Sequence, residues 1–165
     1  KYYNKKNIII TDATANIGGN TISFGLFNYK FINSVEIEEL CYNYLINNIN
    51  CYNLKNIKAY HNNYLDIYLN LYQDVVFLDP PWGGPEYKKE NKLDLFLDNI
   101  NIIKIINNLF LETLTTSIIL KAPFNYNKIK LINKIKNNKN ISINIYKLSK
   151  YNIIYLFKDF KKIEI

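Results

Sequence analysis

The stretch Asp79-Pro80-Pro81-Trp82 places a carboxylate, two ring-locked residues and an indole next to one another. Proline has a fixed φ and no N–H, so the carbonyl of Pro80 can face a ligand. A carboxylate and a carbonyl that converge on one point can accept both hydrogens of an exocyclic amine, while an indole stacks on the flat base that carries the amine. These residue types predict chemistry on a base amine, with Asp79, Pro80 and Trp82 as catalytic residues. The alternative is an ordinary turn around a buried Trp82.

Chemistry of this kind needs no nucleophilic side chain. The lone pair of the amine is delocalised into the base, so alignment with an electrophilic methyl group and exclusion of water would supply much of the rate. The residues that follow, Pro85, Tyr87 and Lys88, extend the candidate substrate site. Lys88 could meet a phosphate, although a run of lysines after a turn is more often a solvated surface.

A second candidate site is the turn from Asp12 to Thr21, which contains Ala13, Gly18 and Asn20. Small residues let a ligand approach the backbone, and the helix that follows offers unpaired N–H groups. Glu36 lies 18 residues after Gly18, about where an open α/β nucleotide site places a carboxylate for both ribose hydroxyls. The pattern predicts a nucleotide-like ligand. Two alternatives are a tightly packed turn and a dinucleotide-dependent dehydrogenase, although Gly-x-Gly-x-x-Gly is absent.

The elements that would position these residues alternate along the chain. Short apolar, β-branched runs predict seven strands, at 7–11, 31–36, 57–60, 74–78, 117–121, 141–148 and 153–157. Helical spacing of apolar residues predicts helices at 21–29, 38–48, 65–71, 93–114 and 127–136. Such alternation is typical of a doubly wound α/β sheet, whose ligands bind at the carboxyl ends of the strands. The last two strands are separated by only Ser149–Asn152 and should pair antiparallel.

Length and composition limit the function classes. A chain of 165 residues with 48% hydrophobic and 15% aromatic residues forms one domain and is too apolar for disorder. Its apolar runs are far shorter than the ~18–20 residues of a membrane span. The net charge of +7, carried by lysine, favours polyanionic partners, although AT-rich codons would also raise lysine. Cys41 and Cys51 suit neither a disulfide framework nor a zinc site, so we expect an intracellular protein without a metal.

Two motifs together, Asp12-Ala13 through Gly18-Gly19-Asn20-Thr21 and Val76 through Tyr87, closely resemble the trimethylguanosine synthases. These class I S-adenosylmethionine-dependent methyltransferases methylate N2 of the 7-methylguanosine cap of RNA. The resemblance implies a seven-stranded Rossmann-like sheet with helices on both faces and an antiparallel terminal hairpin. By the resemblance, Asp12, Gly18, Asn20 and Glu36 match cofactor-binding positions, Asn63-Tyr64 lies where the family has a pair that flanks the adenine, and Trp82 matches the ring that stacks on the methylated guanine. We expect a cofactor site for S-adenosylmethionine and a substrate site for the capped RNA. The first contains Asp12, Ala13, Gly18, Asn20, Thr21, Glu36, Asn63, Tyr64 and Asp79, and the second contains Trp82, Pro85, Tyr87 and Lys88.

Three residues depart from the family pattern. Asn16 replaces a usual Gly, and Asn is the residue that best tolerates positive φ. Asn63 replaces an Asp, so its contact with adenine depends on the orientation of its amide. Asp79 replaces a Ser and resembles the residue of methyltransferases that act on base amines of larger nucleic acids.

These departures leave three hypotheses for function. The first is cap guanine-N2 methylation, the second is adenine-N6 or guanine-N2 methylation of internal nucleotides, and the third is a non-catalytic RNA-binding subunit. We expect residues 1–165 to be a single methyltransferase catalytic domain that lacks the helical extension found in the family before the first strand. We also expect a nuclear or cytoplasmic monomer that binds capped RNA and no membrane.

Overall fold

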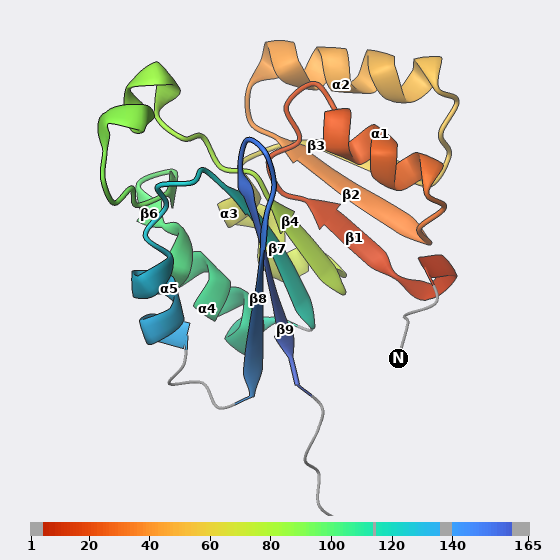
Figure 1. Cartoon of the computed structure of the whole chain (residues 1–165). Helices are drawn as coiled ribbons and strands as arrows, with labels where there is room; N and C mark the ends of the chain where they lie inside the picture. The colour runs from red at the N-terminus through yellow and green to blue at the C-terminus, as the bar shows by residue number, and fades with distance from the viewer. Residues whose placement is uncertain (1–4, 114, 136–139, 160–165) are drawn as a thin grey trace, which may run out of the picture. The chain divides into compact units, whose positions relative to one another are not determined.

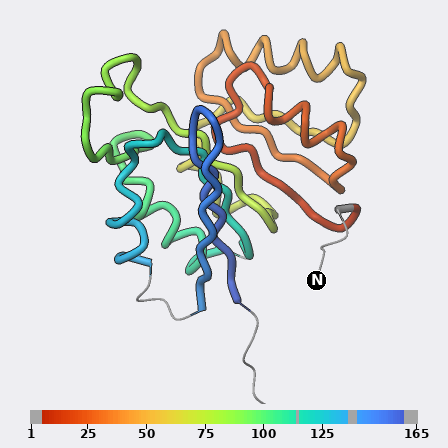
Figure 2. The backbone as a smooth tube through the Cα atoms, in the orientation of Figure 1, coloured from red at the N-terminus to blue at the C-terminus, as the bar shows by residue number. Residues whose placement is uncertain are grey.

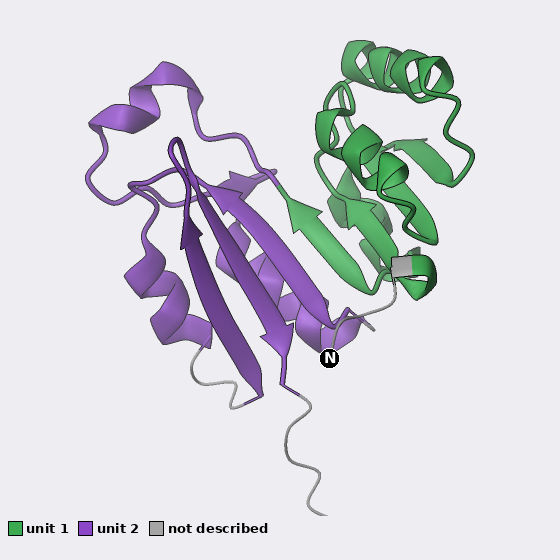
Figure 3. Cartoon of the chain, turned by 45° about the vertical axis from the view of Figure 1, so that its right-hand side comes forward, with its two compact units in different colours: residues 1–78 green, residues 79–165 purple. Residues whose placement is uncertain are grey.

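The computed structural model describes residues 5–113, 115–135 and 140–159, and the ribbon in Figure 1 and the tube in Figure 2 follow the chain through them. The chain divides into two compact units, residues 1–78 and 79–165, which Figure 3 colours green and purple. The single catalytic domain expected over residues 1–165 stays a prediction. No helix within the described ranges is long and apolar enough to span a membrane.

The first unit is built on four parallel strands. They are β1 (Ile9–Asp12), β2 (Phe31–Glu36), β3 (Ile57–His61) and β4 (Val75–Leu78), in the order β3-β2-β1-β4. Nearly every residue of β1, β2 and β4 is buried, as expected for consecutive apolar residues in a parallel sheet. Because the strands are parallel, Asp12 and Glu36 end at the same edge of the sheet.

The helices of this unit follow the strands in turn. They are η1 (Lys5–Asn7), α1 (Gly19–Leu26), α2 (Glu39–Cys51), α3 (Tyr64–Ile67) and η2 (Tyr68–Asn70). The core under α1 and α2 is formed by Ala15, Ile22, Leu45 and Ile49, with Leu54, Ile57 and Ala59 packed against it. This core fixes the start of α1 relative to α2.

The second unit is built on three antiparallel strands, β7 (Ser117–Ala122), β8 (Ile141–Lys147) and β9 (Asn152–Lys158), in the order β7-β9-β8. Strands β8 and β9 form a hairpin, visible as the two adjacent blue segments in Figure 2, whose turn is closed by Leu148 N–H donating to the Tyr151 carbonyl at 2.9 Å. The antiparallel pairing predicted from the short connection is confirmed. The helices of this unit are η3 (Gly84–Lys89), α4 (Ile102–Glu112) and α5 (Lys128–Ile135).

The seven strands follow the order β3-β2-β1-β4-β7-β9-β8, and a separate two-stranded sheet contains β5 (Phe96–Leu97) and β6 (Ile100–Asn101). The predicted fold class, a seven-stranded α/β sheet with an antiparallel terminal hairpin, is confirmed.

One predicted element is wrong at its start. The helix expected over 93–114 begins only at Ile102, because Asp98 and Asn99 adopt positive φ (46° and 62°) and turn the chain between β5 and β6. The side chain of Asn101 then caps α4 by accepting from the Ile103 N–H at 3.0 Å. The predicted ends at Leu114 and Lys136 lie outside the described residues.

Candidate functional site

The end of β1 is tied to α1 and β2 by a buried polar cluster. The Thr21 hydroxyl donates to Asp12 Oδ2 at 2.7 Å and lies 2.6 Å from Ser34 Oγ. All three side chains are fully buried. Asp12 and Thr21, expected to contact the cofactor, therefore hold the first turn of α1 at the carboxyl end of the sheet.

The turn between β1 and α1 lies across the neighbouring strands. Ala13 N–H donates to the Phe77 carbonyl at 3.0 Å, and Ala15 N–H donates to the Val35 carbonyl at 2.9 Å. Both alanine side chains are buried. The small residues of the turn thus allow its backbone to lie close to the sheet, whether or not a ligand also approaches it.

Glu36 is held by the main chain on both of its oxygens. Oε2 accepts from the Asn16 N–H at 2.7 Å and Oε1 accepts from the Glu38 N–H at 2.8 Å. Asn16 has a φ of 50°, the left-handed conformation in which Asn is the best substitute for Gly. A carboxylate has about four acceptor positions. The two acceptor positions that remain on Glu36 suit a pair of hydroxyl donors, so the carboxylate fits the expected ribose.

The two glycines at the start of α1 differ in their surroundings. A Cβ at Gly18, whose φ is 98°, would lie 2.8 Å from Leu45 Cδ1 on α2. Gly18 is therefore required by its backbone conformation and by the packing of α1 against α2. A Cβ at Gly19 would meet nothing within 4 Å, and the half-buried Asn20 follows it. The backbone beside Gly19 is therefore not covered by neighbouring side chains.

The Asn63-Tyr64 pair lies at the start of α3. Asn63 Oδ1 accepts from the Leu65 N–H at 3.0 Å, so this amide caps the helix. The Tyr64 ring is only 2% exposed, and its hydroxyl donates to Gln73 Oε1 at 3.1 Å. Burial raises the pKa of the Tyr64 hydroxyl well above its usual range. The Tyr64 side chain packs in the core, so its backbone is the part left to meet a ligand.

In the second unit Asp79 lies beside aromatic residues and a lysine. The Lys121 ammonium contacts Asp79 Oδ2 at 2.6 Å, and both side chains are less than a quarter exposed. The same ammonium lies 5.9 Å from the centre of the Trp82 ring and 5.1 Å from that of Tyr151. Trp82 packs edge to face against Tyr87 at 5.4 Å. A carboxylate, a cation and an indole thus meet at one place.

The loop after Trp82 is held by Asn125, which follows β7. Gly83 and Gly84 adopt positive φ (91° and 69°), and η3 follows them. Asn125 Nδ2 donates to two carbonyls of this segment, that of Tyr87 at 2.6 Å and that of Glu90 at 2.7 Å. Pro85 and Lys88, both expected in the substrate site, are exposed on the same loop.

Comparison with protein families decides the class of the molecule. Residues 7–162 match the model of the family described as RNA cap guanine-N2 methyltransferase. The chain belongs to this family. The match covers the seven-stranded sheet and the Asp79–Trp82 stretch.

Individual proteins also resemble the chain. It is 33% identical over 156 residues to the uncharacterized protein L320 of Acanthamoeba polyphaga mimivirus, covering 93% of this chain and 59% of the length of that protein. The fold resembles an rRNA methylase of Streptococcus thermophilus (13% identity, TM-score 0.64, covering 94% and 89% of the two chains). It also resembles a Streptococcus mutans protein in complex with SAH (13% identity, TM-score 0.64, covering 93% and 90%).

The sequence predicts that Lys121, at the end of a strand, lines the substrate side of the site, whereas it assigns no role to Asn125. Lys121 and Asn125 are separated from the residues they contact by 42 and 38 positions. Their only sequence signal is that they lie at and just after the carboxyl end of a predicted strand, where sites in α/β sheets occur.

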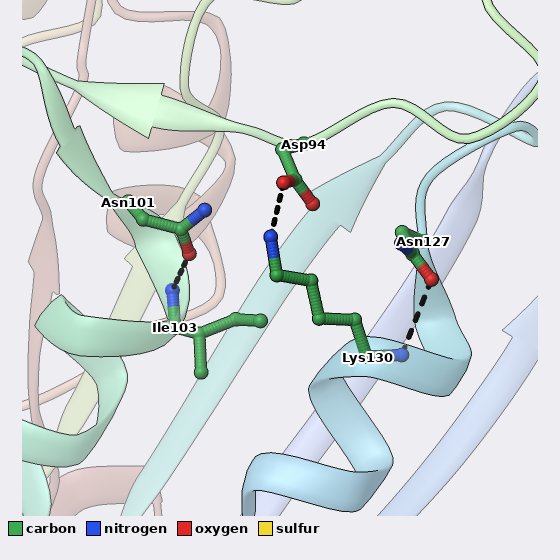
Figure 4. A network of polar contacts seen from close by, with 5 residues as sticks. All are labelled: Asp94, Asn101, Ile103, Asn127 and Lys130. Carbon is green, nitrogen blue, oxygen red and sulfur yellow. Dashed lines mark hydrogen bonds and ion pairs between the residues drawn. The ribbon is translucent and has the colours of Figure 1, made fainter.

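A second ion pair of the same unit has a structural role. Figure 4 shows the Lys130 ammonium bonded to Asp94, while Asn127 caps the first turn of α5 by accepting from the Lys130 N–H at 3.2 Å. Burial and the nearby Asp94 charge raise the pKa of Tyr126 well above its usual range. These contacts join α5 to the segment before β5.

His61, the single histidine, has neighbours of its own. Its ring stacks on Tyr42 with centres 5.1 Å apart, and Nε2 lies 3.1 Å from the Ile37 carbonyl. These contacts give His61 a packing role at the end of β3. Among the residues that the structure describes, no group of three or more His, Cys, Asp or Glu side chains could hold a metal ion.

Proposed function

We propose that this methyltransferase transfers a methyl group to the exocyclic N2 amine of guanine in a 7-methylguanosine RNA cap, as the trimethylguanosine synthases do. The observation that carries the proposal is the contact of Asp79 and Lys121 beside the Trp82 ring. The matching family is described by the same reaction. Capped RNA is accordingly the proposed substrate.

S-adenosylmethionine is the cofactor, and when bound it supplies an electrophilic methyl group. The residues proposed to hold it lie in the first unit, at the carboxyl ends of β1 and β2. Glu36 would accept from the two ribose hydroxyls, because each of its oxygens keeps an acceptor position. Asp12 and Thr21 would act by fixing the first turn of α1. The backbone around Gly19 would face the rest of the ligand.

Asp79 is proposed to orient the amine. Its carboxylate accepts from an N–H of guanine N2, and the Lys121 ammonium keeps that carboxylate in one rotamer. As N2 gains the methyl group it must lose one proton, which passes to water. No side chain of the site has to act as a nucleophile or as a strong base.

Trp82 is proposed to stack on the guanine. N7-methylguanine is cationic, and a cation over an indole gains about 0.5–2 kcal/mol relative to a neutral base. Tyr87 packs against the edge of the indole and keeps its face oriented. The pair Trp82 and Tyr87 therefore favours the methylated cap over an unmethylated one.

The experiment that tests the proposal is mass analysis of nuclease-digested RNA after incubation with labelled S-adenosylmethionine. We expect the label in N2-methylated 7-methylguanosine from the cap. Label in internal adenine or guanine would instead support a methyltransferase of internal nucleotides. If SAH binds but no RNA acquires label, the chain is a non-catalytic RNA-binding member of the family.

A further inference from the structure

The positive charge of the chain is concentrated in one segment. Residues 121–158 contain nine lysines and no aspartate or glutamate, whereas residues 1–78 contain six lysines and six acidic residues. The first unit is therefore neutral. The net charge of +7 resides entirely in the second unit.

Some of these lysines are engaged within the fold. Lys130 pairs with Asp94, and Lys158 lies 5.8 Å from the centre of the Phe110 ring, where burial lowers the pKa of its ammonium. Others gather where β7 ends and the β8–β9 hairpin turns. Lys147 is exposed at the end of β8, and Lys150 is exposed within the hairpin turn.

Aromatic rings alternate with the ammonium groups at this place. The Lys147 ammonium lies 5.8 Å from the centre of the Phe124 ring, and Lys128 Nζ donates to the Phe124 carbonyl at 3.4 Å. Phe124 is 41% exposed, although Phe is usually buried. Asn152 Nδ2 donates to the Pro123 carbonyl at 3.0 Å and fixes the segment that carries Phe124 against β9.

This group of side chains continues to the Asp79 site. Tyr151 follows the hairpin turn, and the Lys121 ammonium lies over both the Tyr151 ring and the Trp82 ring. The half-buried Tyr151 ring of the hairpin therefore shares the Lys121 ammonium with the indole proposed to hold the cap guanine. We call Phe124, Lys128, Lys147, Lys150 and Tyr151 the hairpin surface.

We propose that the hairpin surface binds the single-stranded RNA that follows the cap. Rings and ammonium groups in alternation match the bases and phosphates of a single strand, in which the base faces are open to stacking. A duplex would meet the same charge but would offer Phe124 no open base face. The inference rests on the proposed cap activity, because it takes the strand to leave the Trp82 site along Tyr151.

The test is binding of an uncapped, fluorescein-labelled single-stranded RNA of about 10 nucleotides, followed by anisotropy over a range of salt concentrations. Each phosphate contact to a single strand contributes about 0.7 to the slope of log K against log salt. We expect Lys147→Gln with Lys150→Gln to reduce the slope by about 1.4. Phe124→Ala should weaken binding by roughly 5- to 150-fold.

A matched control removes two exposed lysines of the same unit, Lys104→Gln with Lys134→Gln, on α4 and α5. The control should leave the slope close to that of the parent. Equal loss in the control and the hairpin variant would overturn the inference, since it would mean that only net charge matters. Equally tight binding of a duplex, with no effect of Phe124→Ala, would also overturn it.

Failure of the proposed function is distinguished by a second substrate. On a cap dinucleotide, which has no RNA chain, Lys147→Gln with Lys150→Gln should methylate as the parent does, whereas on capped RNA its KM should rise. If the parent methylates neither substrate, the proposed cap activity is wrong, and binding of uncapped RNA still decides whether the hairpin surface exists. If KM rises equally on both substrates, the hairpin surface is not a site for the chain behind the cap.

Discussion

Replacement of Lys121 by Met should separate a positioning lysine from a structural one. The second unit contains two Lys–Asp ion pairs, Lys121 with Asp79 and Lys130 with Asp94, and in each the side chains are partly buried. Met keeps most of the length of lysine and removes its charge. Lys121→Met and Lys130→Met are therefore a matched pair of variants.

Both variants should lose stability, and only one should lose turnover. An ion pair of this exposure contributes roughly 0.5–2 kcal/mol, so the two variants should lower the free energy of unfolding by similar amounts. Lys121→Met also lets the Asp79 carboxylate leave the orientation in which it meets the amine. If this loss of orientation raises the activation free energy by about 1.4–2.7 kcal/mol, kcat falls roughly 10- to 100-fold. The KM for S-adenosylmethionine should stay the same.

The assay is steady-state methylation of a cap analogue together with urea unfolding, extended to a cycle with Asp79→Asn. If Lys121 acts through Asp79, the double variant should be little slower than Asp79→Asn alone. Fully additive losses would show that Lys121 acts independently of Asp79. An equal fall in kcat for Lys130→Met would refute the positioning role, since stability alone would then explain both results.

Three further predictions concern the other parts of the site. In calorimetry, Glu36→Gln should weaken binding of S-adenosylhomocysteine by at least about 10-fold, because the ribose loses a charged acceptor. The control Glu38→Gln, at an exposed position, should leave the affinity unchanged. Unchanged affinity of Glu36→Gln would exclude the ribose role. A cap analogue should quench the emission of Trp82, the single tryptophan. The N7-methylated analogue should bind about 2- to 30-fold more tightly than the unmethylated one. Equal affinities of the two analogues would remove the argument for a cationic base. Gly18→Ala should lower the free energy of unfolding by more than about 1 kcal/mol, because residue 18 has a φ of 98° and its Cβ would lie 2.8 Å from Leu45 Cδ1. Gly19→Ala should leave the free energy of unfolding unchanged or raise it, because a Cβ at position 19 would meet nothing within 4 Å.

Tertiary contacts overrode the sequence pattern in the helix predicted over 93–114. The apolar spacing over 93–114 is helical, yet Asp98 and Asn99 turn the chain and α4 begins at Ile102. A helical period is a weak signal where two residues that tolerate positive φ lie side by side. The Tyr64 hydroxyl donates to Gln73 in the core, and the place of Tyr64 beside the cofactor stays a prediction. Burial of a side chain depends on what packs over it, which the sequence around position 64 does not contain.

The sequence by itself determined the elements and the motif. Consecutive apolar residues defined the buried strands, the short connection after residue 148 required an antiparallel hairpin, and the types of Asp79, Pro80 and Trp82 indicated chemistry on an amine. These features are local, because each depends on residues within a few positions of one another. Only the tertiary structure placed Lys121 on Asp79 and Asn125 on the loop after Trp82. Contacts across about 40 residues depend on how β7 pairs and where its end lies, and no spacing along the chain encodes that position.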